Sequence, residues 1–386
     1  MEVSQIYSLV NSVNKQLWGE DALTVNDLTG LIALGDTVFS SNSNRDMFLD
    51  KLVDRIGKTI IRNLDLEVEF PNFMRNEMEF GCILQKINIQ LTDAVENKSW
   101  TIADDNFTPN QFKIDKPVIR QSLFSKFVTW EYDLTVPDKL YRSAFTDAST
   151  MGAFIEGIMN AQGDALTLAL NNLMHVALCN FIAEKAKAEN GMINVYALYM
   201  DAYPNSTLTA TEALTAPTPE FLKFVGMVMR NYIGYLAQPS KLYNTEGMLR
   251  ATARDNLHVL ISTDWFSAYE TMLTSDTFNK EIISLPLFER YTTLQATSTT
   301  APNIVSNTKV KVKPSSSGEN DDEVTVNGVI GIFMDRQAIG TTYRDIYTGT
   351  DRNNRNRYTN YTTTADLGLF NDLSESAVIF YIDVVE

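Results

Sequence analysis

Apolar residues recur at two periods along this chain, and the periods separate helical from strand-rich segments. Residues 1–18 place their apolar side chains on one helical stripe, and a second apolar patch follows at Leu28–Phe39. In 45–61 the helical spacing returns, with the basic residues late, where they suit a helix C-terminus. Gly57 offers a break before a short apolar run. We therefore expect a short amphipathic arm at the start, and an amphipathic helix at 45–61 that leads into a strand.

Between residues 64 and 136 the pattern changes to strict alternation. Apolar and polar residues alternate at 64–70, 87–91 and 132–136, which predicts three half-buried strands. The segment contains little apolar mass of its own, and an isolated pair of strands is only marginally stable in water. We therefore expect an extended, strand-rich loop that needs a partner surface.

A long helical pattern covers residues 147–190, and Gly191 stands where a C-terminal glycine belongs. About 40 residues at ~1.5 Å rise would extend on the order of 60 Å, unless one of three internal glycines breaks the helix. Asparagines and a histidine interrupt the uncharged stretch 165–183. This composition favours a buried helix over a membrane span.

Residues 192–365 have the pattern of a mixed domain. It predicts a helix at 220–236 and two buried strands at 258–261 and 329–333. Between the strands it predicts a solvated loop or hairpin at 292–323. A strand-like apolar run at 377–385 closes the chain.

Composition excludes several classes of function. With 44% hydrophobic residues the chain can bury real cores, and its 48 acidic against 32 basic residues give a formal charge of -16. A broad grip on phosphate backbones needs clustered Lys and Arg, so such a surface is not expected. The two cysteines, Cys82 and Cys179, have no metal-type spacing and predict buried thiols. The first 18 residues lack the pattern of a signal peptide.

No pattern of catalytic residues emerges. His175 lies within an apolar helix face and His258 precedes a strand, so both are interpreted as structural. The sequence contains no phosphate-binding glycine loop and no nucleophile-elbow motif. The acidic run 319–323 lacks the ligand spacing of a calcium loop. We therefore expect no catalytic residue, no cofactor and no metal site.

One cationic cluster stands out against the acidic background. It consists of three arginines and two neighbouring tyrosines: Arg352, Arg355, Arg357, Tyr358 and Tyr361. Arginine and tyrosine together can bind nucleic acid by charge and stacking. They are also favoured anchors of protein–protein contacts. Because the chain is acidic, we rank a subunit contact above nucleic-acid binding.

Three passages carry a family resemblance: FLDKLVDRIGKTII at 48–61, SAFTDASTMGAFIEGIMNA at 143–161, and the tail from 333 to 382. Their sequences and order resemble major capsid proteins of small short-tailed (podovirus-type) bacteriophages with double-stranded DNA. Those proteins share the fold of tailed-phage and herpesvirus capsid proteins.

The resemblance implies an α+β fold made of an N-terminal arm, an extended β-hairpin loop, a peripheral domain with a long spine helix, and an axial domain. On this chain the expected parts are the arm and helix at 1–63, the extended loop at 64–136, the peripheral domain at 137–191, the axial domain at 192–365, and a closing strand that returns to the peripheral domain at 366–386.

The same resemblance implies a structural protein rather than an enzyme, one that self-assembles into an icosahedral shell around double-stranded DNA. Copies of the chain in pentamers and hexamers, scaffold and portal proteins, and DNA bound without sequence specificity are the implied partners, with no membrane. The implied location is the virion, after synthesis in the host bacterial cytoplasm. A tail-tube or connector subunit, and less favoured an acidic soluble hydrolase, are the alternatives.

Overall fold

The computed structural model divides the chain into two compact units. Unit 1 is Met1–Phe80, Phe127–Met174 and Thr341–Gly368, and unit 2 is Gly81–Lys126, His175–Gly340 and Leu369–Glu386. Within them the structure describes residues 3–19, 22–41, 43–45, 47–48, 51, 69–74, 84–89, 112, 114, 116, 119–124, 127–137, 139, 148–273, 287–296, 304–306, 309–314, 316–318 and 322–384.

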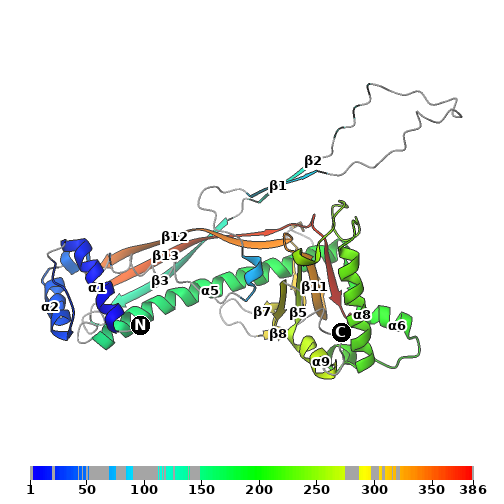
Figure 1. Ribbon diagram of the computed structural model, residues 1–386, viewed down its shortest axis with the longest axis horizontal. Coiled ribbons are helices and arrows are strands. Elements are labelled where there is room, and N and C mark those ends of the chain that lie inside the picture. The colour runs from blue at the N-terminus through cyan, green and yellow to red at the C-terminus, as the bar shows by residue number, and fades with distance from the viewer. Residues whose placement is uncertain are drawn as a thin grey trace. The chain divides into compact units, whose positions relative to one another are not determined.

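Unit 1 combines helices with a three-stranded sheet (Figure 1). The helices are α1 (Val3–Trp18), α2 (Leu28–Phe39), the one-turn η1 (Pro71–Phe73) and the first part of α5 (Ala148–Lys187). The strand order is β12 (Ile339–Asn353), β13 (Tyr358–Asn371), β3 (Phe127–Pro137). β13 and β3 run antiparallel, from the pair Tyr358–Pro137 to the pair Gly368–Phe127.

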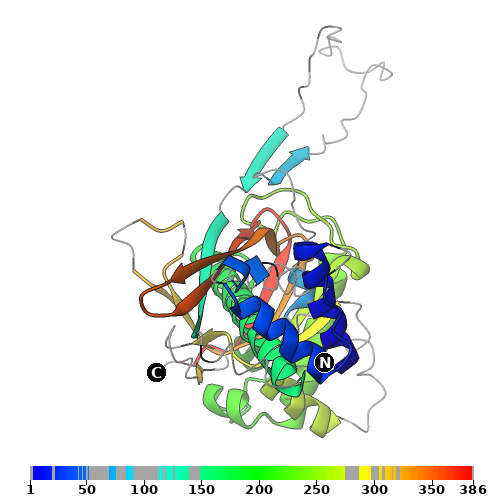
Figure 2. The same ribbon diagram turned by 90° about the vertical axis from the view of Figure 1, so that its left-hand side faces the viewer.

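The core of unit 1 lies where α1 and α2 meet this sheet. Val13 of α1, Val38 of α2 and Tyr361 of β13 are fully buried in one cluster, which Val136 of β3 completes. Figure 2 shows the two helices side by side. These helices thus find a buried core within their own chain.

The helix α5 contains 40 residues without a break, so at ~1.5 Å rise per residue it is about 60 Å long. Its end differs in one detail from the prediction. Asn190 N–H donates to the Lys185 carbonyl and Glu189 N–H to the Ala186 carbonyl, and Glu189 takes the left-handed conformation with φ 48°. This pattern is a Schellman motif, so the left-handed cap residue is Glu189 rather than Gly191.

Gly191 is required for a different reason. Its φ is 70°, and a Cβ at this position would collide with the carbonyl oxygen of Ala377 on the neighbouring strand. The glycine thus permits close packing of two backbones rather than the end of the helix.

By length and composition alone, Gly163–Lys187 could cross a membrane. However, 56% of its most apolar window is buried inside the protein. Burial of this kind is typical of a core helix, as the sequence predicts.

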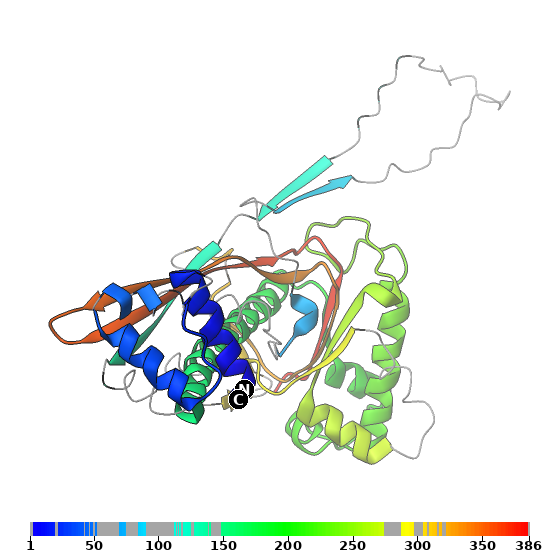
Figure 3. The ribbon, with the colours of Figure 1, turned by 60° about the vertical axis from the view of Figure 1, so that its left-hand side comes forward.

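Unit 2 is built on a five-stranded sheet (Figure 3). The strand order is β4 (Met192–Asn194), β14 (Ala377–Tyr381), β11 (Val329–Asp335), β5 (Leu257–Ser262), β6 (Leu287–Tyr291). β11 runs antiparallel to β14 and β5, whereas each edge strand is parallel to its neighbour. The helices described beside the sheet are the last part of α5, α6 (Val195–Ala202), α7 (Ala210–Thr215), α8 (Pro219–Leu236) and α9 (Thr263–Leu273).

The core of unit 2 explains why the sequences of its central strands, β5 and β11, are continuous apolar runs. All six residues of β5 are buried, as are the first six of β11. α8 packs on them with Phe221, Val225 and Met229. Thr218 caps this helix by accepting a hydrogen bond from Phe221 N–H, and Pro219 occupies its first turn, where no N–H donor is needed. The predicted helix and buried strands are confirmed.

Short strands occupy the expected solvated loop 292–323. They are β7 (Gln295–Ala296), β8 (Ile304–Ser306) and β9 (Val310–Val312), and β9 pairs with β10 (Val324–Val326). Ser316 donates through its backbone N–H and its hydroxyl to the carboxylate of Glu184 on α5, at 2.7 and 2.5 Å. The loop is therefore attached to the last turns of the helix.

Several predictions lie partly or wholly outside the described residues. Residues 43–45, 47, 48 and 51 are helical, but 52–61 are not described. Of the strand expected at 64–70, residues 64–68 are not described, and residues 69 and 70 do not lie in a strand. The expected domain boundaries stay a prediction. In the structure, residues 341–353 and 358–368 pair in the sheet that contains β3, and β14 belongs to the five-stranded sheet of unit 2.

A buried lysine lies near the end of α5. The Lys185 ammonium donates to the Tyr243 carbonyl at 2.7 Å and to Asn190 Oδ1 at 3.2 Å, and its side chain is fully buried. Burial lowers the pKa of Lys185 from 10.5 to about 7, because the charged form loses its hydration.

We expect this lysine to make the free energy of unfolding rise with pH above about 7. Between that pH and 10.5 the unfolded chain holds a proton on Lys185 that the folded chain has released, whereas below it both states hold the proton. Lys185→Met should flatten the rise in urea unfolding measured from about pH 6 to about pH 9.5. Lys187→Met replaces an exposed lysine in the same turn and should keep the rise of the free energy of unfolding with pH. Equal slopes for wild type and Lys185→Met would contradict the assignment.

Candidate subunit-contact surfaces

The arginine cluster lies at the end of a long β-hairpin. β12 ends at Asn353 and β13 begins at Tyr358, so residues 354–357 form the connecting turn (Figure 3). Arg352 is the penultimate residue of β12, and Arg355 and Arg357 belong to the turn. The hairpin therefore brings the three predicted arginines together.

Asn353 shapes the turn through its side chain. Its Oδ1 accepts hydrogen bonds from the backbone N–H of Arg355 at 3.1 Å and of Asn356 at 3.0 Å. Its Nδ2 donates to the Tyr358 hydroxyl at 3.1 Å. Asparagine side chains commonly mimic a backbone turn in this way. The same local chemistry also orients Arg352, whose Nε donates to Asn354 Oδ1 at 2.7 Å.

Arg357 adopts an uncommon backbone conformation. Its φ is 54°, in the left-handed region that glycine or asparagine usually occupies in such turns. A residue other than glycine in this region carries a conformational cost. Arg357 therefore presents a cationic side chain at a position where the backbone alone would favour glycine.

The five predicted site residues differ in exposure. Arg355 and Arg357 are exposed, whereas Arg352 and Tyr358 are half-buried. Among the residues that the structure describes, no carboxylate forms an ion pair with Arg355 or Arg357. Tyr361 is a correction: its side chain is fully buried in the core of unit 1, so it cannot present a contact surface. Tyr361 is buried because it lies on the inner face of β13, opposite Leu134 of β3.

A second candidate surface lies on the hairpin β1 (Leu84–Ile89) and β2 (Ile119–Phe124) of unit 2. These strands pair antiparallel, with Ile89 opposite Ile119. The alternation at 87–91 predicts a half-buried strand, and residues 87–89 do lie in β1, but the buried face is the polar one. Asn88 is 5% exposed, whereas Ile87, Ile89 and Ile119 are 57%, 63% and 58% exposed.

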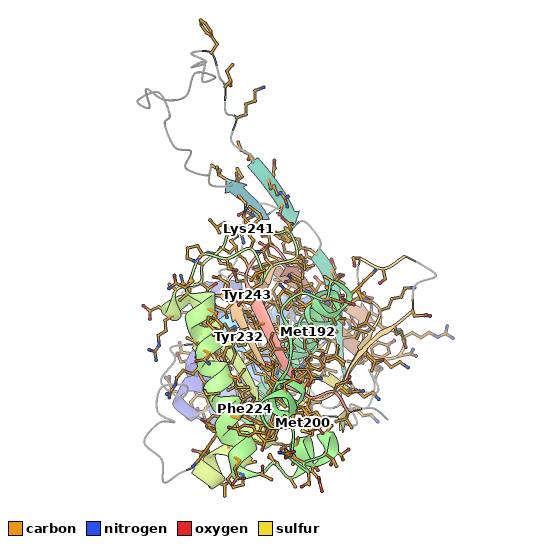
Figure 4. The ribbon with its side chains drawn as sticks, turned by 90° about the vertical axis from the view of Figure 1, so that its right-hand side faces the viewer. Met192, Met200, Phe224, Tyr232, Lys241 and Tyr243 are labelled. Atoms are coloured by element: carbon orange, nitrogen blue, oxygen red, sulfur yellow. The ribbon has the colours of Figure 1, made fainter. Side chains whose placement is uncertain are left out.

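Partly buried aromatic residues pack against the core of unit 2 beside α8. Figure 4 shows Lys241, Tyr243, Tyr232 and Phe224 one below another, with Met192 and Met200 beside them. Tyr232 and Phe224 belong to α8, whereas Lys241 and Tyr243 come after its end. The rings of Tyr232 and Tyr243 meet edge to face at 6.1 Å between centroids. Burial raises the pKa of both hydroxyls, so they stay protonated at neutral pH.

The remaining reactive groups are structural. His258 Nε2 lies 2.6 Å from Glu289 Oε2 in the buried sheet of unit 2. The Cys179 thiol donates to the Leu294 carbonyl at 2.9 Å, and burial raises its pKa to about 12, so it is not a reactive thiolate. Cys82 lies outside the described residues. In the part of the chain that the structure covers, no three His, Cys, Asp or Glu side chains gather as metal ligands.

The arrangement of strands and helices defines the class of protein. A solved structure with a similar fold is the capsid of Staphylococcus phage Andhra, with a TM-score of 0.56 and 9% sequence identity over 82% of this chain and 85% of that one. The fold is therefore the α+β fold of tailed-phage capsid proteins, as the sequence resemblance implies.

The family follows from the sequence as a whole. The Phi29-like phage major capsid protein family matches residues 10–381, and the chain belongs to this family. It is 19% identical over 279 residues to the major capsid protein of Bacillus phage PZA and 18% identical over 281 residues to that of Bacillus phage B103. Each match covers 72% of this chain, and the chain spans 57% and 58% of those relatives. A capsid family agrees with the expectation of a structural protein rather than an enzyme.

Sequence reasoning found the arginines but missed the outward isoleucines and the charged residues beneath them. Lys86 and Asn88 alternate with Ile87 and Ile89. This two-residue period shows that the strand has a polar and an apolar face, but it does not show which face is buried. The signal that decides is the set of carboxylates opposite Lys86, almost 300 positions further along the chain. A single sequence gives no indication of that pairing.

Proposed function

We propose that the chain is the subunit of an icosahedral shell that encloses double-stranded DNA. The observation that carries the proposal is the match of the phage major capsid family to residues 10–381, nearly the whole chain. Copies of the chain would be arranged in pentamers and hexamers. A tail-tube or connector subunit and an acidic hydrolase have no comparable support.

The exposed isoleucines of β1 and β2 support a contact between copies. Large apolar side chains scattered over a surface are ordinary, but here three gather on one face of a hairpin whose other face is already used. That face bears no charge among Ile87, Ile89, Ile119 and Gln121, so acidic copies can approach it without repulsion. Covering it would bury apolar area, the main driving force of association.

The arginine turn supports a second contact. Each copy has a formal charge of -16, so any contact between copies must overcome repulsion. Exposed arginines at the end of a hairpin can reach carboxylates of a neighbouring copy and form bidentate pairs. Each exposed pair contributes only ~0.2–1 kcal/mol, but the contact recurs around every capsomer.

The acidic balance also fits the enclosed DNA. A shell wall of net negative charge does not bind packaged DNA tightly or sequence-specifically, so the DNA keeps its own counterions. Scaffold and portal proteins, location in the virion and synthesis in the host bacterial cytoplasm belong to the same proposal. They follow from the role of a shell subunit.

Negative-stain imaging of the expressed full-length chain tests the proposal. Closed shells, formed alone or with a co-expressed scaffold, are the expected result. Tubes would indicate a tail-tube subunit and rings a connector. Small discrete particles under all assembly conditions would contradict the shell.

Polar replacement of the hairpin isoleucines should impair assembly more than folding. Ile87→Thr with Ile89→Thr keeps β-branched side chains at exposed strand positions, so the free energy of unfolding should change by less than about 0.5 kcal/mol. The assembled fraction, measured by sedimentation, should fall. Ile87→Val with Ile89→Val is the matched control and should assemble as wild type does. Normal assembly of the threonine variant would exclude this face as a contact.

Replacement of Arg352, Arg355 and Arg357 by Ala should leave a folded subunit that assembles poorly, with a defect that varies with salt because charge is involved. The matched control replaces all three by Lys and keeps the charge. It should assemble better than the Ala variant, though without bidentate geometry. Shells that form normally but lose DNA would instead support nucleic-acid binding by the turn.

A further inference from the structure

Four charged side chains meet beneath β1, where the β1–β2 hairpin joins the rest of unit 2. Lys86 Nζ of β1 lies 2.5 Å from Asp372 Oδ2 and 2.5 Å from Glu375 Oε1. Arg250 Nη2 lies 3.5 Å from the same oxygen of Glu375. The side chains of Asp372 and Glu375 are 3% and 8% exposed, those of Lys86 and Arg250 about a fifth. Two cations thus balance two buried carboxylates.

The carboxylates are held by the body of unit 2. Asp372 N–H donates to the Ala338 carbonyl at 2.7 Å, and Asp372 Oδ1 accepts from Ser374 N–H at 2.9 Å. The Ser374 carbonyl accepts from Arg250 Nε at 3.3 Å, and the Ser376 carbonyl from Asp335 N–H at 3.0 Å. The segment 372–376 is therefore fixed at several points before Lys86 reaches it.

The other contacts of the hairpin with this body are weaker. Asn88 Nδ2 donates to Ser374 Oγ at a long 3.4 Å. On β2, Arg120 pairs with Glu246 at 3.1 Å, but both side chains are more than a third exposed, and exposed pairs contribute little. The rings of Phe124 and Phe370 lie 5.3 Å apart. Of the described contacts, only that of Lys86 joins the hairpin to buried carboxylates.

We infer that Lys86 is a positioning residue for assembly. Its ammonium is held between Asp372 and Glu375, and this fixes the direction in which the hairpin points. The hairpin thereby presents Ile87, Ile89 and Ile119 to a second copy of the chain. The inference rests on the proposed shell function. A buried ion pair suits this role, because breaking it leaves an uncompensated charge, so the hairpin cannot turn away without a large penalty. An apolar contact is non-directional and would tolerate a range of orientations.

The test measures orientation and assembly separately in the full-length chain. Spin labels at Gln121→Cys on β2 and Asn231→Cys on α8, both exposed, report the distance from hairpin to body once Cys82 and Cys179 are replaced by Ser and Ala. Because Gln121 lies on the proposed contact face, assembly is measured on the unlabelled chain that keeps its own residues at these four positions. Lys86→Met should broaden the distance distribution and reduce the assembled fraction about tenfold. The control is Lys311→Met, which removes the lysine of an exposed ion pair with Glu323 in the same unit and should change neither.

A double variant separates positioning from stability. Lys86→Met with Asp372→Asn removes one charge of each sign, so it should restore the urea midpoint toward wild type. If Lys86 only stabilises the fold, the double variant will also regain the narrow distance distribution and normal assembly, and the inference is wrong. A broad distribution and poor assembly at restored stability support it.

The labelled subunit also keeps the two proposals distinguishable. If the wild-type chain never forms shells, the shell proposal fails, yet the distance measurement still shows whether Lys86 orients the hairpin. If wild type assembles and Lys86→Met keeps the narrow distribution, the inference alone is overturned.

Discussion

Burial of apolar side chains in two separate cores is the interaction on which the rest of the structure depends. In unit 1 the helices α1 and α2 close over β3 and β13. In unit 2 the strands β5, β11 and β14 pack against α8 and α9. The β1–β2 hairpin lies outside both clusters of buried apolar residues. A two-stranded hairpin without a core is marginal in water, so its attachment must come from another interaction. Here that interaction is electrostatic, and the hairpin turns its apolar face outward.

The sequence alone predicted the elements with the strongest patterns. The period of 3.6 located α5 and α8, and continuous apolar runs located β5, β11 and β14, because a strand buried on both faces has no polar alternation. The family resemblance supplied the fold class, which local patterns could not. The long strands β12 and β13 were missed as a hairpin, since their many threonines alternate with apolar residues only in part. A single sequence also gives no register between β13 and β3, more than 200 residues apart.

The failures at the candidate site have specific physical causes. Tyr361 was grouped with the arginines because it is near them in sequence, but position on the inner face of β13 places its ring in the core. The strand expected at 87–91 overlaps β1 only at 87–89, and the alternation did not show that its apolar face would be the exposed one. Hydrophobicity normally decides which face is buried, and here the carboxylates of Asp372 and Glu375 override it. The arginines were found because charges close together in the sequence are visible without a structure. The turn that brings them together in space depends on the hydrogen bonds of the Asn353 side chain, which the sequence does not show.

If the chain is the shell subunit that we propose, the outward isoleucines and the buried charge cluster meet one requirement together. A surface that must bind many copies has to be apolar enough to associate, yet it must not turn inward and satisfy itself against its own chain. If the inner face of β1 carried isoleucines as well, either face could pack on unit 2, and the hairpin could rotate between the two arrangements. Lys86 and Asn88 prevent this, because only the face that carries them matches the carboxylates and hydroxyl of 372–376. A one-residue shift would bring isoleucine against two buried carboxylates, which would lose their counter-charge. The ion cluster therefore selects one face and one register, and it leaves the apolar face exposed.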